Sequence, residues 1–367
     1  MIYFFVPAAQ EFAIKDYLDL FGRKFREDIR IFHYEDLVHQ REFFKGTYVL
    51  AGLDQLNVGL AQLVLEIYEQ LRHIEGVRFL NHPRDTLHRF ELLKKLHDVG
   101  RNDFRAVKAE GDLQGLRFPV FLREQSQHDG AICPLLNSGR EIREALGRAL
   151  LQGHKLKNLL IVEFCDTSNG TGFYRKYAAF IVGERVIARS LNFGRQWMLK
   201  HSETEFTMPM VQEELEYVST NPHEQQLREV FELAQVEYGR IDYAIHNNKV
   251  QTWEINLNPT IGRGLIRRSA PLPPDLDAVR DEVRRHFYEG FERAWREVDL
   301  PTNSEPIKVT PNPQTLLAAQ ATYESHDRLL STFKTLLRPA KPLIVPISRP
   351  FVFTLGSLAR LLRQKRS

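Results

Sequence analysis

The chain has 367 residues, of which 43% are hydrophobic and 26% are charged. These values are ordinary for a globular protein and exclude collagen-like, disulfide-rich and wholly disordered chains, while the length indicates two or three domains. The net charge of +3 is unevenly spread, because residues 331–367 hold eight basic residues and no acidic one, which leaves the remainder at −5. The overall charge therefore gives no support to a nucleic-acid-binding surface.

Signals for secretion or membrane insertion are weak. Only Cys133 and Cys165 are present, which excludes a disulfide framework and a Cys-rich zinc site. The apolar run at residues 2–6 is short and lacks the basic leader of a signal peptide. The best membrane candidate, residues 343–359, is interrupted by Arg349 and two prolines, whereas a spanning helix needs about 20 apolar residues. We predict a cytoplasmic protein.

The first 80 residues alternate between strand-like and helix-like segments. The expected elements are strands at 2–6, 29–33 and 47–50 and a helix over 58–74. This alternation predicts a small open α/β domain. A helix over residues 85–98 follows it.

From residue 118 onward, strands become frequent. The expected elements are strands at 118–123 and 159–164, a hairpin at 173–191, a helix over 223–235, a second hairpin at 239–258 and a helix over 275–298. Between the first two strands, Ser138 followed by Glu141 has the spacing of a capping box that opens a helix. Prolines and polar residues increase beyond Pro301, so we place the end of the compact body near residue 300.

The second hairpin, residues 239–258, carries the most informative pattern. Because side chains alternate along a strand, the apolar residues of each strand fall on one face. Matching the two apolar faces fixes the register and requires a loop with an odd number of residues. Residues 247–249 can form such a loop. In that register Asp242 lies directly opposite Glu254, and Asn256 shares their face.

Two opposed carboxylates on a sheet repel one another, so a cation is expected near them. Carboxylate and amide oxygens suit Mg²⁺, which typically takes one or two carboxylates together with phosphate and water oxygens. The alternative is a solvated polar face that Arg240 neutralises. In the same register Trp253 falls on the apolar face, away from the carboxylates.

The pattern Asp242–(x)11–Glu254-x-Asn256, followed by Pro259 and Gly262, resembles the metal-binding signature of the ATP-grasp ligases. D-alanine–D-alanine ligase, glutathione synthetase and the peptide-modifying glutamate ligases belong to that superfamily. The resemblance implies an ATP-grasp fold of combined α/β and α+β class. The implied parts are an N-terminal α/β domain at 1–84, ATP-grasp subdomains at 85–165 and 166–300, and a basic tail at 301–367.

The resemblance also implies ATP and Mg²⁺, or Mn²⁺ in its place, as cofactors. The metal ligands would be Asp242, Glu254 and Asn256. Positive side chains reach the phosphates from a helix and a strand end, where this chain has Arg89 and Arg123 instead of the commoner Lys; Arg keeps the charge but differs in geometry. The residues implied to hold adenine and ribose are Glu163, Phe164, Cys165 and Asp166. For Asp166, the alternative is a residue that caps its own loop.

Further basic residues are implied at the phosphates or the substrate. Arg175 and Lys176 are neighbours on a strand, so only one of them can face the phosphates, and the family pattern favours Arg175. Arg189 lies on the next strand, and Arg263 lies between two glycines that permit close backbone approach. The loop around His128 corresponds to the phosphate-covering loop of the family, although it is poor in glycine and no P-loop motif occurs.

The implied activity is an ATP-dependent ligase that converts a small-molecule or peptide carboxylate into an acyl phosphate and joins it to an amine. The alternative is a nucleotide-binding scaffold without turnover, which the Arg-for-Lys replacements and the glycine-poor loop favour. The tail combines apolar residues with a basic cluster at 360–366, as in segments that contact anionic membrane surfaces. An arm packed on the acidic body, or a disordered end, is the alternative for the tail. No nucleic-acid partner is expected, and the sequence leaves the oligomeric state open.

Overall fold

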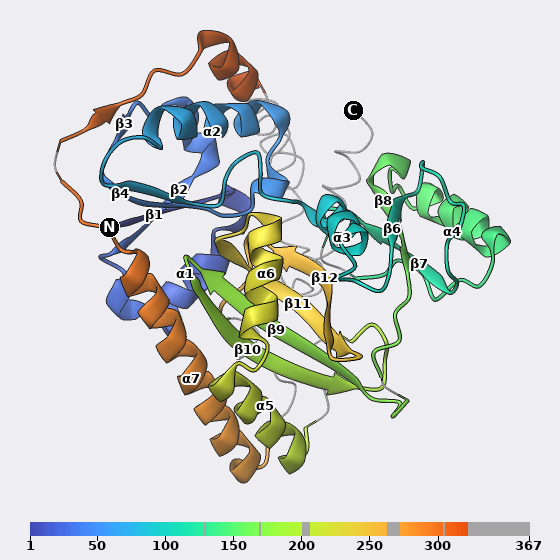
Figure 1. The fold of residues 1–367 in the computed structure, drawn as a ribbon. Helices are drawn as coiled ribbons and strands as arrows, with labels where there is room; N and C mark the ends of the chain where they lie inside the picture. Colours follow the sequence, from blue (N-terminus) through green and yellow to red (C-terminus); the bar gives the residue numbers. More distant parts are fainter. Residues whose placement is uncertain (128–129, 169, 200–205, 263–271, 304, 322–367) are drawn as a thin grey trace, which may run out of the picture.

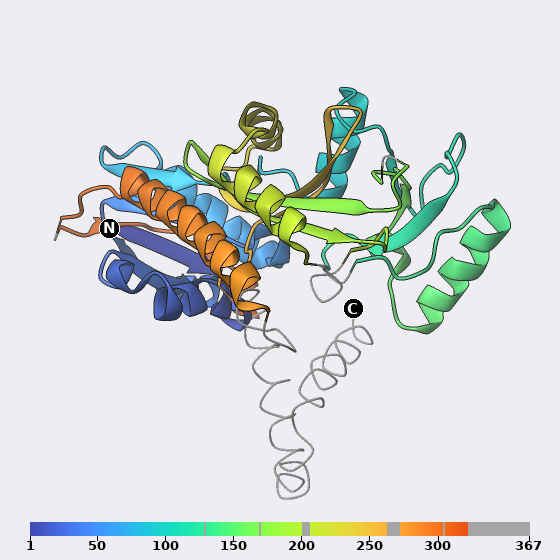
Figure 2. The same cartoon turned by 90° about the horizontal axis from the view of Figure 1, so that it is seen from below.

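The fold is taken from a computed structural model of the chain. It describes all residues except 128–129, 169, 200–205, 263–271, 304 and 322–367. Three units follow one another along the chain: an N-terminal domain, a small subdomain and a central body (Figure 1). The central body lies between the other two units (Figure 2). The predicted combination of α/β and α+β architecture is confirmed.

The N-terminal domain is built on a four-stranded parallel sheet with the order β2-β1-β4-β5. The strands are β1 Ile2–Val6, β2 Ile29–His33, β4 Gly46–Leu50 and β5 Val77–Leu80. The crossovers contain the helices α1 Phe12–Leu20 and α2 Val58–Leu71. Strand β1 is buried along its whole length, as expected for an inner strand of a parallel sheet. The open α/β domain predicted from the sequence is therefore confirmed.

The chain returns to the N-terminal domain after residue 300. Strand β13 Ile307–Lys308 pairs antiparallel with β3 Glu42–Phe43, so the first part of the predicted tail packs against this domain. Gly59 permits the contact, because a Cβ there would lie 2.8 Å from the carbonyl oxygen of Ala318. The basic cluster of the tail lies outside the described residues, and its membrane contact stays a prediction. Within the part of the chain that is described, no helix is long and apolar enough to cross a membrane.

The small subdomain carries a three-stranded antiparallel sheet with the order β6-β8-β7. Its strands are β6 Ala106–Lys108, β7 Val120–Glu124 and β8 Leu159–Glu163. Helix α4 Gly139–Leu151 begins at the predicted cap, where Oγ of Ser138 accepts the N–H of Glu141 at 3.3 Å. The Glu141 carboxylate accepts the N–H of Asn137, one residue earlier than a capping box requires. Helix α3 Arg89–Asp98 contacts β6 and also β12 of the central body.

The central body is a four-stranded antiparallel sheet with the order β10-β9-β11-β12. Its strands are β9 Tyr174–Val182, β10 Arg185–Gly194, β11 Tyr238–His246 and β12 Lys249–Asn256. The helices that pack on it are α5 Met208–Thr220, α6 Glu224–Ala234 and α7 Pro274–Val298. One face carries Tyr177 and Tyr243, which pack with Tyr217 of α5. The other face carries Phe180, which packs against α7, and farther along β9 it carries Lys176.

The β11–β12 hairpin has the predicted register at its carboxylates but a different turn. Asp242 pairs with Glu254, as expected. The turn has two residues, Asn247 and Asn248, with φ of 49° and 58°, which a type I′ turn requires. A two-residue turn alone would not bring Asp242 opposite Glu254. One extra residue in β12, a β-bulge at Trp253, restores that pairing. The predicted three-residue loop is therefore wrong.

The N-terminal domain and the central body share one hydrophobic core. Phe4 of β1 packs edge to face on Tyr238 of β11 and on Trp295 of α7. The small subdomain has a separate core, which includes Leu122 and Ile161. The charged residues of β11 therefore stand on a wide, jointly packed base, whereas the small subdomain is packed largely on itself.

Candidate functional site

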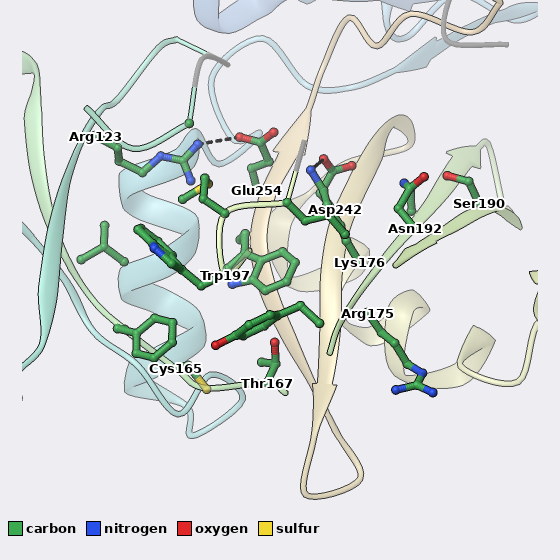
Figure 3. Close-up of a pocket in the computed structure, with 18 of the residues that line it drawn as sticks. Arg123, Cys165, Thr167, Arg175, Lys176, Ser190, Asn192, Trp197, Asp242 and Glu254 are labelled. Carbon is green, nitrogen blue, oxygen red and sulfur yellow. Dashed lines mark hydrogen bonds and ion pairs between the residues drawn. The ribbon is translucent and has the colours of Figure 1, made fainter. Parts of the chain in front are cut away.

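A cavity of about 490 Å³ lies between the sheets of the small subdomain and the central body (Figure 3). Its volume is within the range of pockets that hold small ligands and cofactors. Strands β7 and β8 provide one wall, and strands β9 to β12 provide the other. The predicted site residues that line it are Arg123, Glu163, Phe164, Cys165, Arg175, Lys176, Arg189, Asp242 and Glu254.

Asp242 lies at the charged end of the cavity and is held by two cations. Nζ of Lys176 lies 2.8 Å from Oδ2, and Nε of Arg240 lies 2.9 Å from Oδ1. Burial alone would raise the pKa of Asp242, but the attraction of Arg240 and Lys176 outweighs burial and lowers it. The carboxylate is therefore ionised at neutral pH, which is the form that binds a metal ion.

Glu254 repeats this arrangement from β12. Its Oε2 accepts hydrogen bonds from Arg123 of β7, at 2.8 Å, and from Arg89 of α3. The Arg123–Glu254 contact spans the cavity between the two walls (Figure 3). Nη1 of Arg89 also donates to the backbone carbonyl of Glu124 at 2.9 Å. Burial, followed by repulsion from Arg89, lowers the pKa of Arg123 to about 10, so its guanidinium stays charged at neutral pH.

Asp242 and Glu254 are the groups suited to hold a metal ion. They face each other across β11 and β12, and two carboxylates are sufficient for Mg²⁺ when phosphates and water supply the other oxygens. Among the described residues, no group of three or more His, Cys, Asp or Glu gathers into a metal cage. Oδ1 of Asn256 accepts the N–H of Asn258 at 2.9 Å, so the third predicted ligand is engaged within its own loop. Its role as a ligand stays a prediction.

Lys176, rather than Arg175, faces the carboxylates. Arg175 turns away from Asp242 (Figure 3) and pairs with Glu213 of α5, with Nε 2.7 Å from Oε1. The strand register explains why Lys176 lies beside Asp242, and the predicted role of Arg175 toward the phosphates stays a prediction. Asp242 pairs with Ala178 of β9, and Lys176 lies two residues from Ala178 and so shares its face.

Arg189 enters the cavity wall through a β-bulge. The bulge falls between Ala188 and Ser190, so Arg189 is the extra residue, and both Arg189 and Ser190 line the cavity. Bulges re-aim side chains in this way. The Arg189 guanidinium lies 4.4 Å from the ring centroid of Phe287 on α7, and the side chain is buried.

The opposite end of the cavity is aromatic. The ring centroid of Trp197 lies 5.0 Å from that of Phe121 and 5.7 Å from that of Phe164. The bulge at Trp253 brings this side chain into the cavity beside its neighbour Glu254, contrary to the predicted placement on the opposite face. Further apolar lining comes from Phe104, Val162, Met198 and Leu199. A flat ligand group fits such walls, since aromatic rings stack on one another.

Glu163 and Asp166 make contacts within the protein. Glu163 is buried, and its carboxylate accepts the N–H of Arg117 at 2.9 Å and the N–H of Arg105 at 3.1 Å. Oδ1 of Asp166 accepts the N–H of Ser168 at 3.0 Å, which is the loop-capping contact considered as its alternative. Both side chains therefore brace the segment that follows β8, and their predicted roles toward a nucleotide stay predictions.

The structure adds site residues that the sequence pattern missed. Trp197 lies in an irregular segment after β10, where no periodicity indicates a role, and Arg280 comes from the distant helix α7. Arg240 was expected only to neutralise a polar face, although its place two residues before Asp242 puts it on the carboxylate face. Arg263 and His128 lie outside the described residues and stay predictions.

No protein-family model matches the chain, and no curated protein matches it. Among solved structures, a D-alanine–D-alanine ligase from Bacillus anthracis is 13% identical, with a TM-score of 0.44, over 81% of this chain and 98% of that one. Its complex with ATP gives a TM-score of 0.41. An L-amino acid ligase from Bacillus licheniformis is 11% identical, with a TM-score of 0.38, over 72% of this chain and 67% of that one. The case for function therefore rests on the residues of the cavity.

Proposed function

We propose that the protein is an ATP-dependent ligase, which activates a carboxylate as an acyl phosphate and joins it to an amine. The observation that carries the proposal is the charged end of the cavity. There Asp242 and Glu254 oppose each other, and each is paired with two cations. When a nucleotide binds, the basic side chains can bind phosphate oxygens instead of the carboxylates, while the carboxylates bind a metal ion.

In this proposal ATP lies along the cavity. Its base would lie among the aromatic side chains of Phe121, Trp197 and Trp253, and its phosphates would take the cations that now contact Asp242 and Glu254. The cations concerned are Arg89, Arg123, Lys176 and Arg240. Asp242 and Glu254 would hold Mg²⁺, or Mn²⁺ in its place, which neutralises charge on the phosphate oxygens.

The reaction proposed has two steps. An oxygen of the substrate carboxylate attacks the γ-phosphorus, and the bond to the β–γ bridging oxygen breaks, so that ADP leaves with the electron pair. The amine nitrogen then attacks the acyl carbon, a C–N bond forms, phosphate leaves and the amine proton passes to solvent. In this proposal the protein contributes positioning and charge stabilisation, and the cations of Arg123, Lys176 and Arg240 would provide the charge stabilisation.

A substrate screen tests the proposal. ADP formation is measured with Mg²⁺ and ATP across pools of amino acids and short peptides, with product mass as a second readout and hydroxylamine added to trap an acyl phosphate as a hydroxamate. We expect turnover that a carboxylate–amine pair stimulates. Lys176→Met should lower it by about 10²-fold and Glu254→Ala should abolish it, while the exposed control Glu232→Ala on α6 should leave it intact.

Two outcomes would contradict the ligase. One is ATP binding without stimulated turnover by any pool, which would favour the nucleotide-binding scaffold. The other is unchanged turnover in Glu254→Ala, since the reaction would then not depend on a metal ion held by these carboxylates. Thermal melting of each variant separates loss of chemistry from loss of folding.

A further inference from the structure

A third carboxylate holds one of the arginines that line the cavity. Glu214 of α5 is buried, and its Oε2 accepts a hydrogen bond from Arg280 of α7 at 2.9 Å. Arg189 of β10 lines the same cavity as Arg280. We infer that these three residues form a subsite, called here the Arg189 subsite, that binds a second, non-reacting carboxylate of the acid substrate. The inference rests on the proposed ligase function and narrows its substrate to an acidic one.

The first support is that Arg189 is a buried cation without a bonded counter-ion. Its exposed fraction is 8%, and among the described residues it makes no hydrogen bond or ion pair, only the stack on Phe287. Burial lowers the pKa of Arg189, and Tyr288 and the carboxylate of Glu214 offset this only in part. A buried charge without a partner is costly, so a bound anion would supply what the protein does not.

The second support is that Glu214 holds the Arg280 side chain while one N–H donor of its guanidinium has no partner. Glu214 accepts from Nη1 of Arg280 on one oxygen and from the N–H of Leu191 on the other, at 3.4 Å. Nε of Arg280 is buried and has no hydrogen-bond partner among the described residues. Glu214 therefore positions Arg280 without using all of its donors.

The third support is the charge balance around the cavity. Asp242 and Glu254 each contact two cations that the proposed reaction assigns to the triphosphate. Arg189 and Arg280 line the same cavity but come from β10 and α7, elements that do not supply those cations. A second anion is therefore a suitable partner for these two arginines.

That anion is best provided by a group whose charge persists. The reacting carboxylate passes its negative charge to the phosphoryl oxygens when the acyl phosphate forms, so a fixed guanidinium pair would lose its partner during the reaction. A second carboxylate on the same substrate keeps its charge throughout. Two guanidinium groups also suit a carboxylate, because charge-assisted hydrogen bonds from arginine match its planar geometry.

The first test needs no substrate. In the full-length protein without ligand, Arg189→Gln removes an unpaired buried charge, so its melting temperature should rise by about 1–3 °C. The control is Arg185→Gln on the same strand, where an exposed arginine pairs with Glu297, and its melting temperature should change by less than about 1 °C. A lower melting temperature for Arg189→Gln would mean that Arg189 serves the fold, which would overturn the inference.

The second test compares acid–amide pairs as substrates with ATP and Mg²⁺: glutamate with glutamine, aspartate with asparagine, and peptides ending in each. We expect kcat/KM for the best acid to exceed that of its amide at least tenfold in the wild type. In Arg189→Gln and Arg280→Gln this ratio should fall below about threefold, while KM for ATP stays within about twofold and Arg185→Gln behaves as the wild type.

The outcomes separate the inference from the ligase itself. Stimulated ADP formation with equal kcat/KM for acid and amide would overturn the Arg189 subsite and leave the ligase standing. A raised KM for ATP in Arg189→Gln would also overturn it, since Arg189 would then belong to the triphosphate site. No ADP formation with any carboxylate in the wild type would overturn the ligase and the subsite together.

Discussion

The two walls of the cavity differ in chemistry and in how they are supported. The wall from the small subdomain presents Phe121, Val162 and Phe164, with Arg123 as its cation. The wall from the central body presents Lys176, Asp242, Glu254 and their charged neighbours. A ligand with a flat apolar end and a highly charged end matches this division.

The supports of the two walls differ as well. The charged wall stands on a core that the central body shares with the N-terminal domain, whereas the small subdomain has its own core. The units meet in a smaller cluster, where Trp197 and Trp253 pack against buried residues that include Phe104 and Phe121. The difference teaches that the charged side chains stand on a jointly packed base, while the aromatic wall belongs to a separately packed unit that Arg123 and Arg89 tie to Glu254.

Removing the Glu254 carboxylate, which both arginines contact, should have the largest effect, and that effect is on the stability of the fold. Glu254→Gln leaves Arg89 and Arg123 as buried cations without their shared carboxylate, and removing one partner of a buried pair costs about 3–5 kcal/mol of the free energy of unfolding. Chemical denaturation measures it. The control is Glu213→Gln, whose partner Arg175 is partly exposed, and its cost should stay below about 1 kcal/mol. Equal costs would show that the tie across the cavity does not stabilise the fold.

Removing the cation on Asp242 should have the next largest effect. Lys176→Met should lower stimulated turnover by about 10²-fold, since preorganised charges of this kind typically contribute that much. Its chain neighbour provides the comparison, because Arg175→Met should lower turnover less than about threefold. Steady-state ADP formation decides between them. The opposite ranking would restore the family-based preference for Arg175.

The aromatic wall should contribute less than the charged one. Trp197→Ala removes the ring that packs on Phe121 and Phe164, and base–aromatic stacking is worth about 1–3 kcal/mol. ATP binding should weaken about tenfold, while binding of inorganic tripolyphosphate stays unchanged, as calorimetry can show. Equal weakening of both ligands would place the base elsewhere.

The thiol of Cys165, at the aromatic end of the cavity, gives the smallest expected effect and reports on its immediate surroundings. Burial raises the pKa of Cys165 to about 11, so its alkylation by iodoacetamide should be slow at pH 7 and should keep rising with pH beyond 9, because only the thiolate reacts. The Cys133→Ser variant isolates Cys165, and ATP should slow the reaction further. A rate that levels off near pH 8.5 would show that the thiol is not in an apolar setting.

The sequence was sufficient to predict the pairing of the two carboxylates, because side-chain alternation governs the part of the hairpin that carries them. Apolar matching placed Asp242 opposite Glu254, and that pairing is present. Strict alternation failed where the chain adds a residue, at Trp253 and at Arg189. Each bulge brings two consecutive side chains to the cavity, and bulges are set by how strands meet in the sheet rather than by local sequence.

Residues from distant elements could not be predicted in the same way. Arg280 and Glu214 come together only because α5 and α7 pack side by side. In the sequence of either helix taken alone, each of these charged residues is explained as an ordinary solvent-exposed position. The choice between Arg175 and Lys176 likewise required the β9–β11 register. The resemblance to a family suggested the class of chemistry that we propose, while the tertiary structure showed which groups contact each charge.

A direct titration of ATP tests the central claim that this cavity binds a metal–nucleotide complex across its two walls. With Mg²⁺, ATP should bind at one saturable site, change the tryptophan emission through Trp197, and bind at least tenfold more weakly in EDTA or in Lys176→Met. Binding that is absent at millimolar ATP, or that neither Mg²⁺ nor Lys176→Met alters, would contradict the account.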